Sequence, residues 1–168
     1  MAAKHRLADN FIHLGMGATA EPQPAFDGME WYQDYTQRTA GDGKEGRLVS
    51  QHSFTEGWPS WEMHPHGSEV VICTRGAMVL TQEFPDGRIE TMTLEAGDYA
   101  INPPGVWHIA DVETHAEAIF ITAGEGTQHR ERGASAAASL PPAERRRLAD
   151  TIRDKSARAR HKAATLDR

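Results

Sequence analysis

The sequence predicts an all-β fold, an antiparallel sandwich or barrel, and two observations support this prediction. Seven short segments between residues 47 and 123 are rich in Val, Ile, Thr and aromatic residues, which half-buried strands favour. No helical pattern separates these segments, as it would in a parallel α/β sheet. The seven expected strands are 47–54, 68–74, 77–84, 88–94, 98–102, 106–112 and 116–123.

The clearest turn lies between the third and fourth of these strands. The residues at 84–88 read Phe-Pro-Asp-Gly-Arg. An Asp-Gly pair accommodates the positive φ that tight hairpins require. The two neighbouring strands are therefore expected to pair as a hairpin within a β-barrel domain at 46–126.

The residues before the barrel are irregular in pattern and are expected to form an N-terminal arm over 1–45. Pro22 and Pro24 interrupt its first part, and residues 39–46 read as a flexible turn. Between these breaks, residues 29–37 could form a strand or a short arm.

After the last strand we expect a solvated exit loop at 124–130. A linker is expected over 127–140, so that it overlaps the end of this loop, and a basic helix is expected at 141–168. Ala, Arg and Lys favour the helix, and Ser139 could cap its start. The helix has nine Lys/Arg against four Asp/Glu, a charge of +5, so the rest of the chain carries −11 when the net charge is −6. Its apolar stripe is thin, so we expect it to pack on the barrel, pair with another subunit or fray.

Composition narrows the class of protein. A chain of 168 residues is long enough for one domain with a real core, and no apolar run approaches the roughly 18–20 residues of a membrane span. The start lacks the apolar region of a secretory signal, and a single cysteine excludes an internal disulfide framework, so a cytoplasmic location is expected. The basic tail carries no nucleic-acid-binding motif and no aromatic residue for base stacking. We therefore expect neither a membrane nor a nucleic acid as partner.

A cluster of potential metal ligands occupies residues 61–69, which read WEMHPHGSE. Glu62 and His64 share one face if the segment is a strand, because side chains alternate along a strand. The proline and small residues that follow are expected to end this strand near His64. A hairpin would then bring Glu69 back beside the first two side chains, so that two adjacent strands supply three ligands.

A fourth ligand is expected from the segment 97–112, where His108 lies on a short strand after a Pro-Pro-Gly turn. Two carboxylates and two imidazoles form a mixed nitrogen and oxygen set, which suits Fe²⁺, Mn²⁺, Zn²⁺ or Ni²⁺ better than soft thiophilic ions. The sequence therefore predicts one divalent transition metal ion per chain. Open coordination positions would remain for water, substrate or dioxygen.

The two segments resemble the paired motifs of the cupin superfamily, and the resemblance covers roughly residues 46–123. In the first motif of that family, six residues separate a glutamate from a glycine, as they separate Glu69 from Gly76 here. The second motif runs glycine, five residues, Pro-x-Gly, two residues, histidine, three residues, asparagine. The chain fits it up to the histidine, and Val112 stands where the asparagine would be. The matching positions are Gly97, Pro103, Gly105 and His108.

The His-x-His part of the first motif has two registers in this chain. The register that begins at His64 leaves two residues before Glu69, one fewer than the usual minimum, whereas the register that begins at Glu62 leaves four. Spacing and strand geometry favour the second register, with Glu62 in place of the first histidine. The resemblance then implies a double-stranded β-helix, or jelly-roll barrel, around one metal ion. Its expected ligands are Glu62, His64, Glu69 and His108.

Four further side chains are candidates for contacts with the metal ligands or the substrate. Gln51 and His52 are neighbours on one strand, so one of them must point inward. His66 could be a spare ligand or an acid or base beside the metal, but we expect a loop histidine that faces solvent. Cys73 shares a strand face with Glu69, and we expect it to be a small buried apolar residue.

The resemblance implies a metal-dependent enzyme that acts on a small organic molecule inside the barrel. A dioxygenase is the first expectation, followed by a non-redox isomerase or lyase that acts on a sugar or keto acid, because carboxylate-rich sites suit enolisation. A cupin that binds or senses a small molecule without turnover is the alternative. The resemblance also implies a homodimer formed through arm exchange and sheet contacts. The sequence does not identify catalytic residues beyond the metal ligands.

Overall fold

The structure, a computed structural model, describes residues 3–134. The expected basic helix at 141–168 and the second half of the expected linker lie outside the described residues. The chain divides into two compact units, Met1–Arg130 and Glu131–Arg168, and the description of the second unit covers its first four residues.

Within the described residues, the regular structure consists of ten strands, one α-helix and three short 3₁₀ turns. No helix there is long and apolar enough to cross a membrane. The first elements are β1 (Asn10–Gly15), β2 (Thr19–Ala25), α1 (Glu30–Arg38), β3 (Arg47–Phe54) and β4 (Ser60–Met63). The later strands are β5 (Glu69–Glu83), β6 (Ile89–Glu95), β7 (Tyr99–Asn102), β8 (Trp107–Asp111), β9 (Ala116–Thr122) and β10 (Gln128–Glu131). The 3₁₀ turns are Met16–Ala18, Ala40–Glu45 and Arg132–Ala134.

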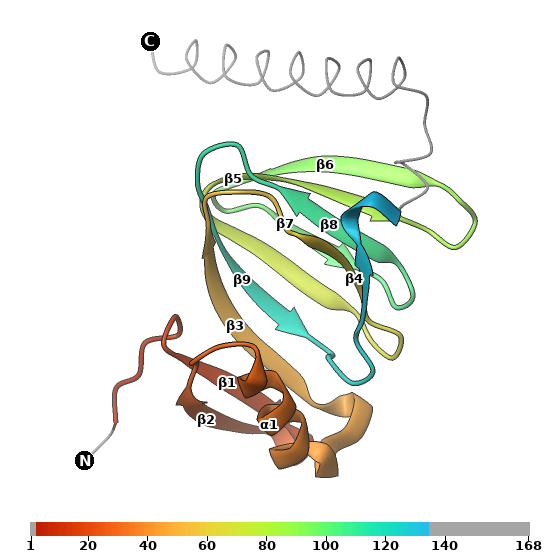
Figure 1. Cartoon of the computed structure of the whole chain (residues 1–168). Helices are drawn as coiled ribbons and strands as arrows, with labels where there is room; N and C mark the ends of the chain where they lie inside the picture. The colour runs from red at the N-terminus through yellow and green to blue at the C-terminus, as the bar shows by residue number, and fades with distance from the viewer. Residues whose placement is uncertain (1–2, 135–168) are drawn as a thin grey trace, which may run out of the picture. The chain divides into compact units, whose positions relative to one another are not determined.

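The strands form two sheets that share the long strand β5 (Figure 1). The strand order in the first sheet is β2-β1-β3-β9-β5-β7. In the second sheet the order is β10-β4-β8-β5-β6. Every described register between these strands is antiparallel, so the predicted antiparallel barrel of jelly-roll type is confirmed.

The strands expected at 68–74 and 77–84 are one continuous strand, β5, which passes from the first sheet to the second. Its pairing with β9 shifts register just after Cys73, which marks a β-bulge. Gly76 follows with a φ of 71°, and a side chain there would collide with the backbone carbonyl of His115. A bulge bends a strand sharply without ending it, so one strand can serve both sheets.

The hairpin expected at 84–88 is present between β5 and β6. The Phe84 amide donates a hydrogen bond to the carbonyl of Arg88 at 2.9 Å. Gly87 has a φ of 84°, the conformation that an Asp-Gly pair makes accessible. The turn therefore sets the register of the two strands on either side of it.

The N-terminal segment is more regular than the expected arm, because β1 and β2 extend the first sheet and α1 is a helix where a strand or short arm was expected. Trp31 and Tyr35 lie one helical turn apart, and their rings stack with centroids 5.3 Å apart. The Trp31 ring packs edge-on against Phe11 of β1 at 5.1 Å. His13 of β1 hydrogen-bonds the Tyr35 hydroxyl at 2.8 Å and the Asp42 carboxylate at 2.7 Å. An aromatic pair spaced i, i+4 faces one side of a helix, which explains the preference for helix over strand.

Two clusters of buried side chains make up the core. The main cluster is built largely by β5, β8 and β9, and the second consists of Phe11, Trp31 and Leu48. His52 on β3 joins the two clusters, because its ring lies 5.2 Å from the ring of Phe11 and 5.9 Å from the ring of Phe120. The N-terminal segment and the barrel therefore pack as one body within the unit Met1–Arg130.

Residues 128–131 lie inside the expected linker but form the strand β10 beside β4. The Arg130 guanidinium makes two contacts with the Glu83 carboxylate, at 2.9 and 3.2 Å. It also lies over the rings of Trp61 and Trp107, with 5.0 and 4.5 Å to their centroids. These contacts attach β10 to the second sheet, so the barrel extends past the boundary expected at residue 126.

Candidate metal centre

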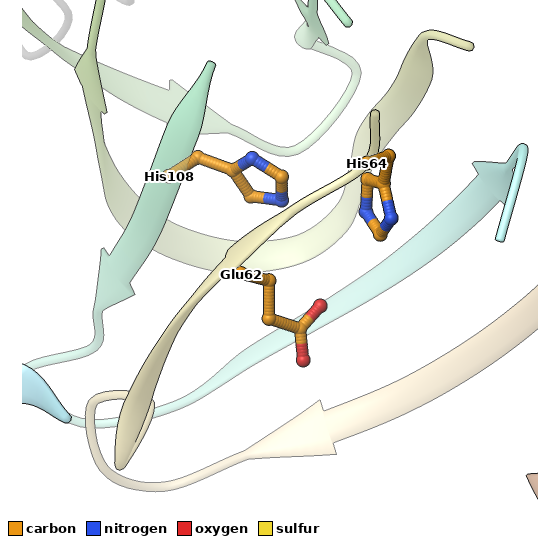
Figure 2. A group of neighbouring side chains, drawn as sticks. All are labelled: Glu62, His64 and His108. Carbon is orange, nitrogen blue, oxygen red and sulfur yellow. The ribbon is translucent and has the colours of Figure 1, made fainter. Parts of the chain in front are cut away.

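Two adjacent strands of the second sheet place three of the four expected ligands. Glu62 on β4 lies directly opposite His108 on β8, and His64 follows the end of β4 by one residue. Residues opposite each other, or two apart on one strand, face the same side of a sheet. Figure 2 shows that the three side chains point into the same space between the strands.

These three side chains bring their ligand atoms within range of a single metal ion. One nitrogen from each imidazole and one oxygen of Glu62 all lie within 4.8 Å of one another. His64 and His108 are 3% and 0% exposed, whereas the side chain of Glu62 is 34% exposed. The centre therefore has a buried imidazole side and a carboxylate side that reaches solvent.

Glu69 reaches the centre from the opposite sheet, so the expected hairpin between its strand and the strand of Glu62 is wrong. Glu69 begins β5, where it pairs with Asn102 of β7 and Thr122 of β9. Residues 64–68 carry the chain from the second sheet to the first instead of turning it back. The ligands therefore converge across the interior of the barrel, not along one hairpin.

The Glu69 carboxylate contacts both imidazoles. Its Oε2 lies 3.1 Å from Nε2 of His108, and its Oε1 lies 3.4 Å from Nε2 of His64. Glu62 lies beside the same two imidazoles. All four side chains expected from the sequence therefore lie close to one another.

The hydrogen bonds of the two imidazoles determine which nitrogen carries the proton in the neutral ring. Thr127 donates its hydroxyl proton to the carbonyl of Gly124 at 2.8 Å, so its oxygen accepts from Nδ1 of His64 at 2.8 Å. Nδ1 of His108 lies 3.1 Å from the carbonyl of Val106, which can only accept. Each ring is thus held with Nδ1 protonated, and each Nε2 presents a lone pair to the centre.

These two Nε2 lone pairs are the observation that fits a metal ion. Both atoms are buried and make no hydrogen bond in the structure, although each lies near an oxygen of Glu69. A lone pair that faces a carboxylate oxygen is repelled unless a proton or a cation lies between them. Two imidazole nitrogens and carboxylate oxygens are also the donors that divalent transition metals prefer. The residues present therefore fit such an ion.

Three buried polar side chains, which the sequence did not identify, hold Glu69 in place. Asn102 donates to its Oε2 at 3.0 Å, and Thr122 donates to its Oε1 at 2.7 Å. Gln82 in turn donates to the side-chain oxygen of Asn102 at 2.7 Å. Asn102 is 1% and Gln82 3% exposed. Only one feature of the sequence indicates a role for Asn102 and Gln82. Each is a polar residue on the inward face of an otherwise apolar strand.

The charges at the centre favour a cationic occupant. Burial alone would raise the pKa of Glu69, but the adjacent His108 and His64 outweigh burial and lower it. Burial works to lower the pKa of His108, yet the same Glu69 carboxylate raises it. Glu69 is therefore an anion that attracts positive charge into a buried site.

His129 on β10 contacts the carboxylate of Glu62, although residues 124–130 were expected to form a solvated exit loop. Its Nε2 lies 3.3 Å from Oε1 of Glu62, and its side chain is 51% exposed. The hydrogen bond to Glu62 raises the pKa of His129. No motif in the sequence predicts this contact, because the contact depends on the pairing of β10 with β4.

Tyr32 of α1 and His52 of β3 form a polar pair near the two carboxylates. The Tyr32 hydroxyl lies 3.3 Å from Nε2 of His52. Burial, with the negative charges of Glu62 and Glu69, raises the pKa of Tyr32 to about 12. Burial lowers the pKa of His52, so both partners are neutral near pH 7. Of the two neighbours considered in the sequence, His52 points inward and Gln51 lies on the opposite face of β3.

The two remaining candidates from the sequence lie apart from the ligands. His66 is exposed in the loop between β4 and β5. Cys73 is 0% exposed within the main core cluster, and burial raises the pKa of its thiol. A buried thiol with a raised pKa is a poor nucleophile, in keeping with a packing role for Cys73.

Replacing Thr127 with valine should weaken metal binding by about 10- to 100-fold, which is the usual effect of losing the outer hydrogen-bond partner of a histidine ligand. The reason is that His64 would lose the acceptor that holds its proton on Nδ1. A competition titration against a chromophoric chelator measures the change. Thr127→Ser keeps the hydroxyl and should bind metal as the unmodified protein does; equal weakening in both variants would contradict the role given to the hydroxyl.

Comparisons with known proteins were made for the sequence and for the structure. No curated protein matches the chain. Among solved structures, a cupin superfamily protein of Desulfitobacterium hafniense is 19% identical over 45% of this chain and 65% of its own, with a TM-score of 0.38. Hydroquinone 1,2-dioxygenase of a Sphingomonas species is 16% identical over 45% and 59%, with a TM-score of 0.40. Oxalate decarboxylase of Bacillus subtilis is 15% identical over 68% and 30%, with a TM-score of 0.44.

This chain covers less than two thirds of each of these three proteins, and likenesses of this size carry no argument about activity. The match to a family is more direct. A family model described as the cupin domain matches residues 54–124, the region that contains all four expected ligands and both sequence motifs. Residues 54–124 of this chain are therefore similar to the cupin domain, in agreement with the resemblance of the two sequence motifs.

Proposed function

We propose that this protein is a metal-dependent enzyme that acts on a small organic molecule within the barrel. Its four expected ligands would hold one divalent transition metal ion, with Fe, Mn, Zn and Ni as the candidates that suit the donor atoms. The observation that carries the proposal is the pair of buried Nε2 lone pairs of His64 and His108, which face the Glu69 carboxylate without a hydrogen bond. The proposed ligands are Glu62, His64, Glu69 and His108.

A bound ion would supply a Lewis acid with open positions for water, substrate or dioxygen. On one side of the ion the protein would contribute rigidly held side chains, and on the other side a carboxylate that is free to adjust. His64, His108 and Glu69 are buried and held by hydrogen bonds, so they would fix the position of the ion. Glu62 is partly exposed and contacts His129, so substrate would approach from the side of this carboxylate.

Tyr32 and His52 are proposed to orient the substrate. Both are neutral near pH 7 and hydrogen-bonded to each other, so they offer a donor and an acceptor without adding charge. Such a pair suits a hydroxyl or carbonyl oxygen. The pair lies close enough to Glu62 and Glu69 for their negative charges to raise the pKa of Tyr32, which supports this role.

Dioxygenation is the reaction class that we propose first. Aromatic rings continue from the centre into the core, since the ring of Trp58 lies 6.2 Å from that of His108 and 5.7 Å from that of Phe120. Dioxygen is apolar and small, so such surroundings favour its entry over that of water. The non-redox isomerase or lyase and the binding protein without turnover are alternative outcomes of the test below.

The test is elemental analysis of the full chain purified without added metal, followed by oxygen-uptake screening on small organic molecules. The proposal predicts about one transition metal ion per chain, and loss of that ion in the double variant Glu62→Ala/His108→Ala. Glu56→Ala, at an exposed position outside the centre, is the matched control and should keep the ion.

The outcomes separate the three functions. Bound iron with oxygen uptake supports the dioxygenase, whereas bound zinc or manganese with turnover but no oxygen uptake supports an isomerase or lyase. An unmodified protein that holds no transition metal, even after incubation with Fe²⁺, Mn²⁺, Zn²⁺ and Ni²⁺, would overturn the proposal and leave the binding protein.

A further inference from the structure

The side chain of Arg130, on β10, is held by residues from three neighbouring strands of the second sheet. Its guanidinium contacts the Glu83 carboxylate of β5 at 2.9 and 3.2 Å. The same group lies over the ring of Trp61 on β4 and the ring of Trp107 on β8, with 5.0 and 4.5 Å to the centroids. The ion pair is largely buried, since the side chain of Arg130 is 20% exposed and that of Glu83 is 13% exposed. A planar guanidinium can pair with a carboxylate and stack on aromatic rings at once, so one side chain joins three strands.

These three contacts lie directly behind the metal centre. The register of the second sheet places Glu62 opposite His108, and His108 opposite Gln82. Each side chain that Arg130 contacts is the sequence neighbour of one of these three residues. Because side chains alternate along a strand, the contacts of Arg130 are on the outer face of the sheet, at the level at which the three residues point inward. Arg130 therefore joins β4, β8 and β5 where the first two strands present ligands and the third leads through Gln82 toward Glu69.

Arg130 also anchors the segment that contacts two of the proposed ligands from outside. Three residues before it, the Thr127 hydroxyl accepts the hydrogen bond from Nδ1 of His64 at 2.8 Å. The residue directly before it, His129, lies 3.3 Å from Oε1 of Glu62. The positions of both groups depend on how firmly β10 is held against β4. The ion pair and ring contacts of Arg130 attach β10 through residues that are not ligands themselves.

The ligand that depends most on this attachment is Glu62. A metal centre needs its donor atoms held within roughly 0.5 Å of their working positions by side chains that cannot change rotamer. Glu62 has the most exposed side chain of the four proposed ligands, at 34%, so packing around the side chain holds it least. Its position therefore depends on β4, which carries it, and on the β10 segment beside it. The contacts of Arg130 fix both.

We propose that Arg130 is a positioning residue for the metal centre. From the outer face of the second sheet it fixes the spacing of the strands that carry Glu62 and His108, and it sets the place of β10 beside them. Arg130 does not touch the ion or the substrate, and it acts through the ligands. This inference rests on the proposed function, because it concerns the ligands proposed there.

The test is a titration of the full chain with Co²⁺, whose visible absorption bands depend on the number and arrangement of its donor atoms. In Arg130→Lys the positive charge beside Glu83 remains, but the plane that stacks and the fork that makes two contacts are lost. This variant should bind Co²⁺ about 10-fold more weakly, as expected for the loss of an outer partner, and its absorption bands should shift. Arg130→Met also removes the charge and should show the same shift with a larger loss of affinity.

Arg88→Lys is the matched control. Arg88 likewise lies over an aromatic ring, with 3.7 Å to the centroid of Phe84, and it pairs with the carboxylates of Asp86 and Glu90. It lies in the hairpin between β5 and β6, where none of the proposed ligands is found. Arg88→Lys should therefore keep both the affinity for Co²⁺ and the spectrum of the unmodified protein.

The spectrum separates positioning from a purely structural role. Spectra are recorded at saturating Co²⁺, well below the unfolding temperature of each protein, so a loss of stability alone leaves the bands unchanged. If Arg130→Met does not fold, Arg130→Lys, which keeps the charge, decides the question. Unchanged bands and affinity in Arg130→Lys overturn this inference and leave the proposed function intact. An unmodified chain that binds no Co²⁺ overturns both.

Discussion

His64→Ala is expected to lose its divalent metal ion, while His66→Ala two residues away keeps it. His64 is buried and presents Nε2 to Glu69, whereas His66 is exposed in the following loop. Loss of an outer hydrogen-bond partner costs about 10- to 100-fold in metal affinity, so loss of a ligand should exceed roughly 100-fold. The measurement is competition against a chelator of known affinity, with elemental analysis after dialysis.

This pair of variants also decides between the two registers of the first motif. His64 is a ligand in both registers, whereas His66 is a ligand only in the register that begins at His64. Loss of metal from His66→Ala as well as from His64→Ala would therefore contradict the assignment of Glu62 as a ligand. Thermal unfolding of the metal-free proteins serves as the control for folding, because His64 is buried and its removal leaves a small cavity. A metal-free His64→Ala protein that is still folded would show that the loss of metal is not a loss of structure.

Gly76→Ala is expected to destabilise the fold more than any other glycine substitution named here. Gly76 has a φ of 71°, and a side chain would collide with the backbone carbonyl of His115. The left-handed conformation alone costs an L-residue about 1–2 kcal/mol. The collision involves backbone that cannot rotate away, so we expect a total loss of roughly 3 kcal/mol or more in the free energy of unfolding.

Gly87→Ala separates the two contributions. Gly87 has a similar φ of 84°, but nothing lies within 4 Å of a side chain placed there. Its substitution should therefore cost only the conformational part, about 1–2 kcal/mol. Urea unfolding of both variants gives the comparison, and equal losses would show that the contact with His115 is unimportant.

Most strands could be predicted from the sequence because their residues favour β structure locally. The run 116–123, for example, contains Ile119, Phe120, Ile121 and Thr122, and Gly124 follows its end. The sequence predicts two strands, 68–74 and 77–84, where β5 is one, because a glycine that permits a bulge looks like a glycine that ends a strand. Helix α1 was missed because its stability comes from the contact of Trp31 with Phe11, which lies 20 residues earlier.

The four expected ligands could be named from the sequence because two motifs with defined spacing carry them. Their partners depend on contacts between distant segments and leave no local pattern. Tyr32 reaches His52 only because α1 packs on the first sheet, and Thr127 reaches His64 only because the chain returns to β4 after β9. The route of the chain to Glu69 was predicted wrongly for the same reason: adjacency in sequence suggested a hairpin, whereas the ladder pairs Glu69 with Asn102 and Thr122.

The cupin match begins at residue 54, but the strand β3, which pairs with β9, comes before that residue. The segment that can be transferred to another protein as an intact fold is therefore longer than the matched region 54–124. β3 pairs with β9 at seven positions, from Leu48 to Phe54, and its other edge is covered by β1. A fragment cut at residue 54 would expose an apolar strand edge that other chains could join, which is a route to aggregation. Domain shuffling or grafting of this barrel should therefore keep residues 10–131 together.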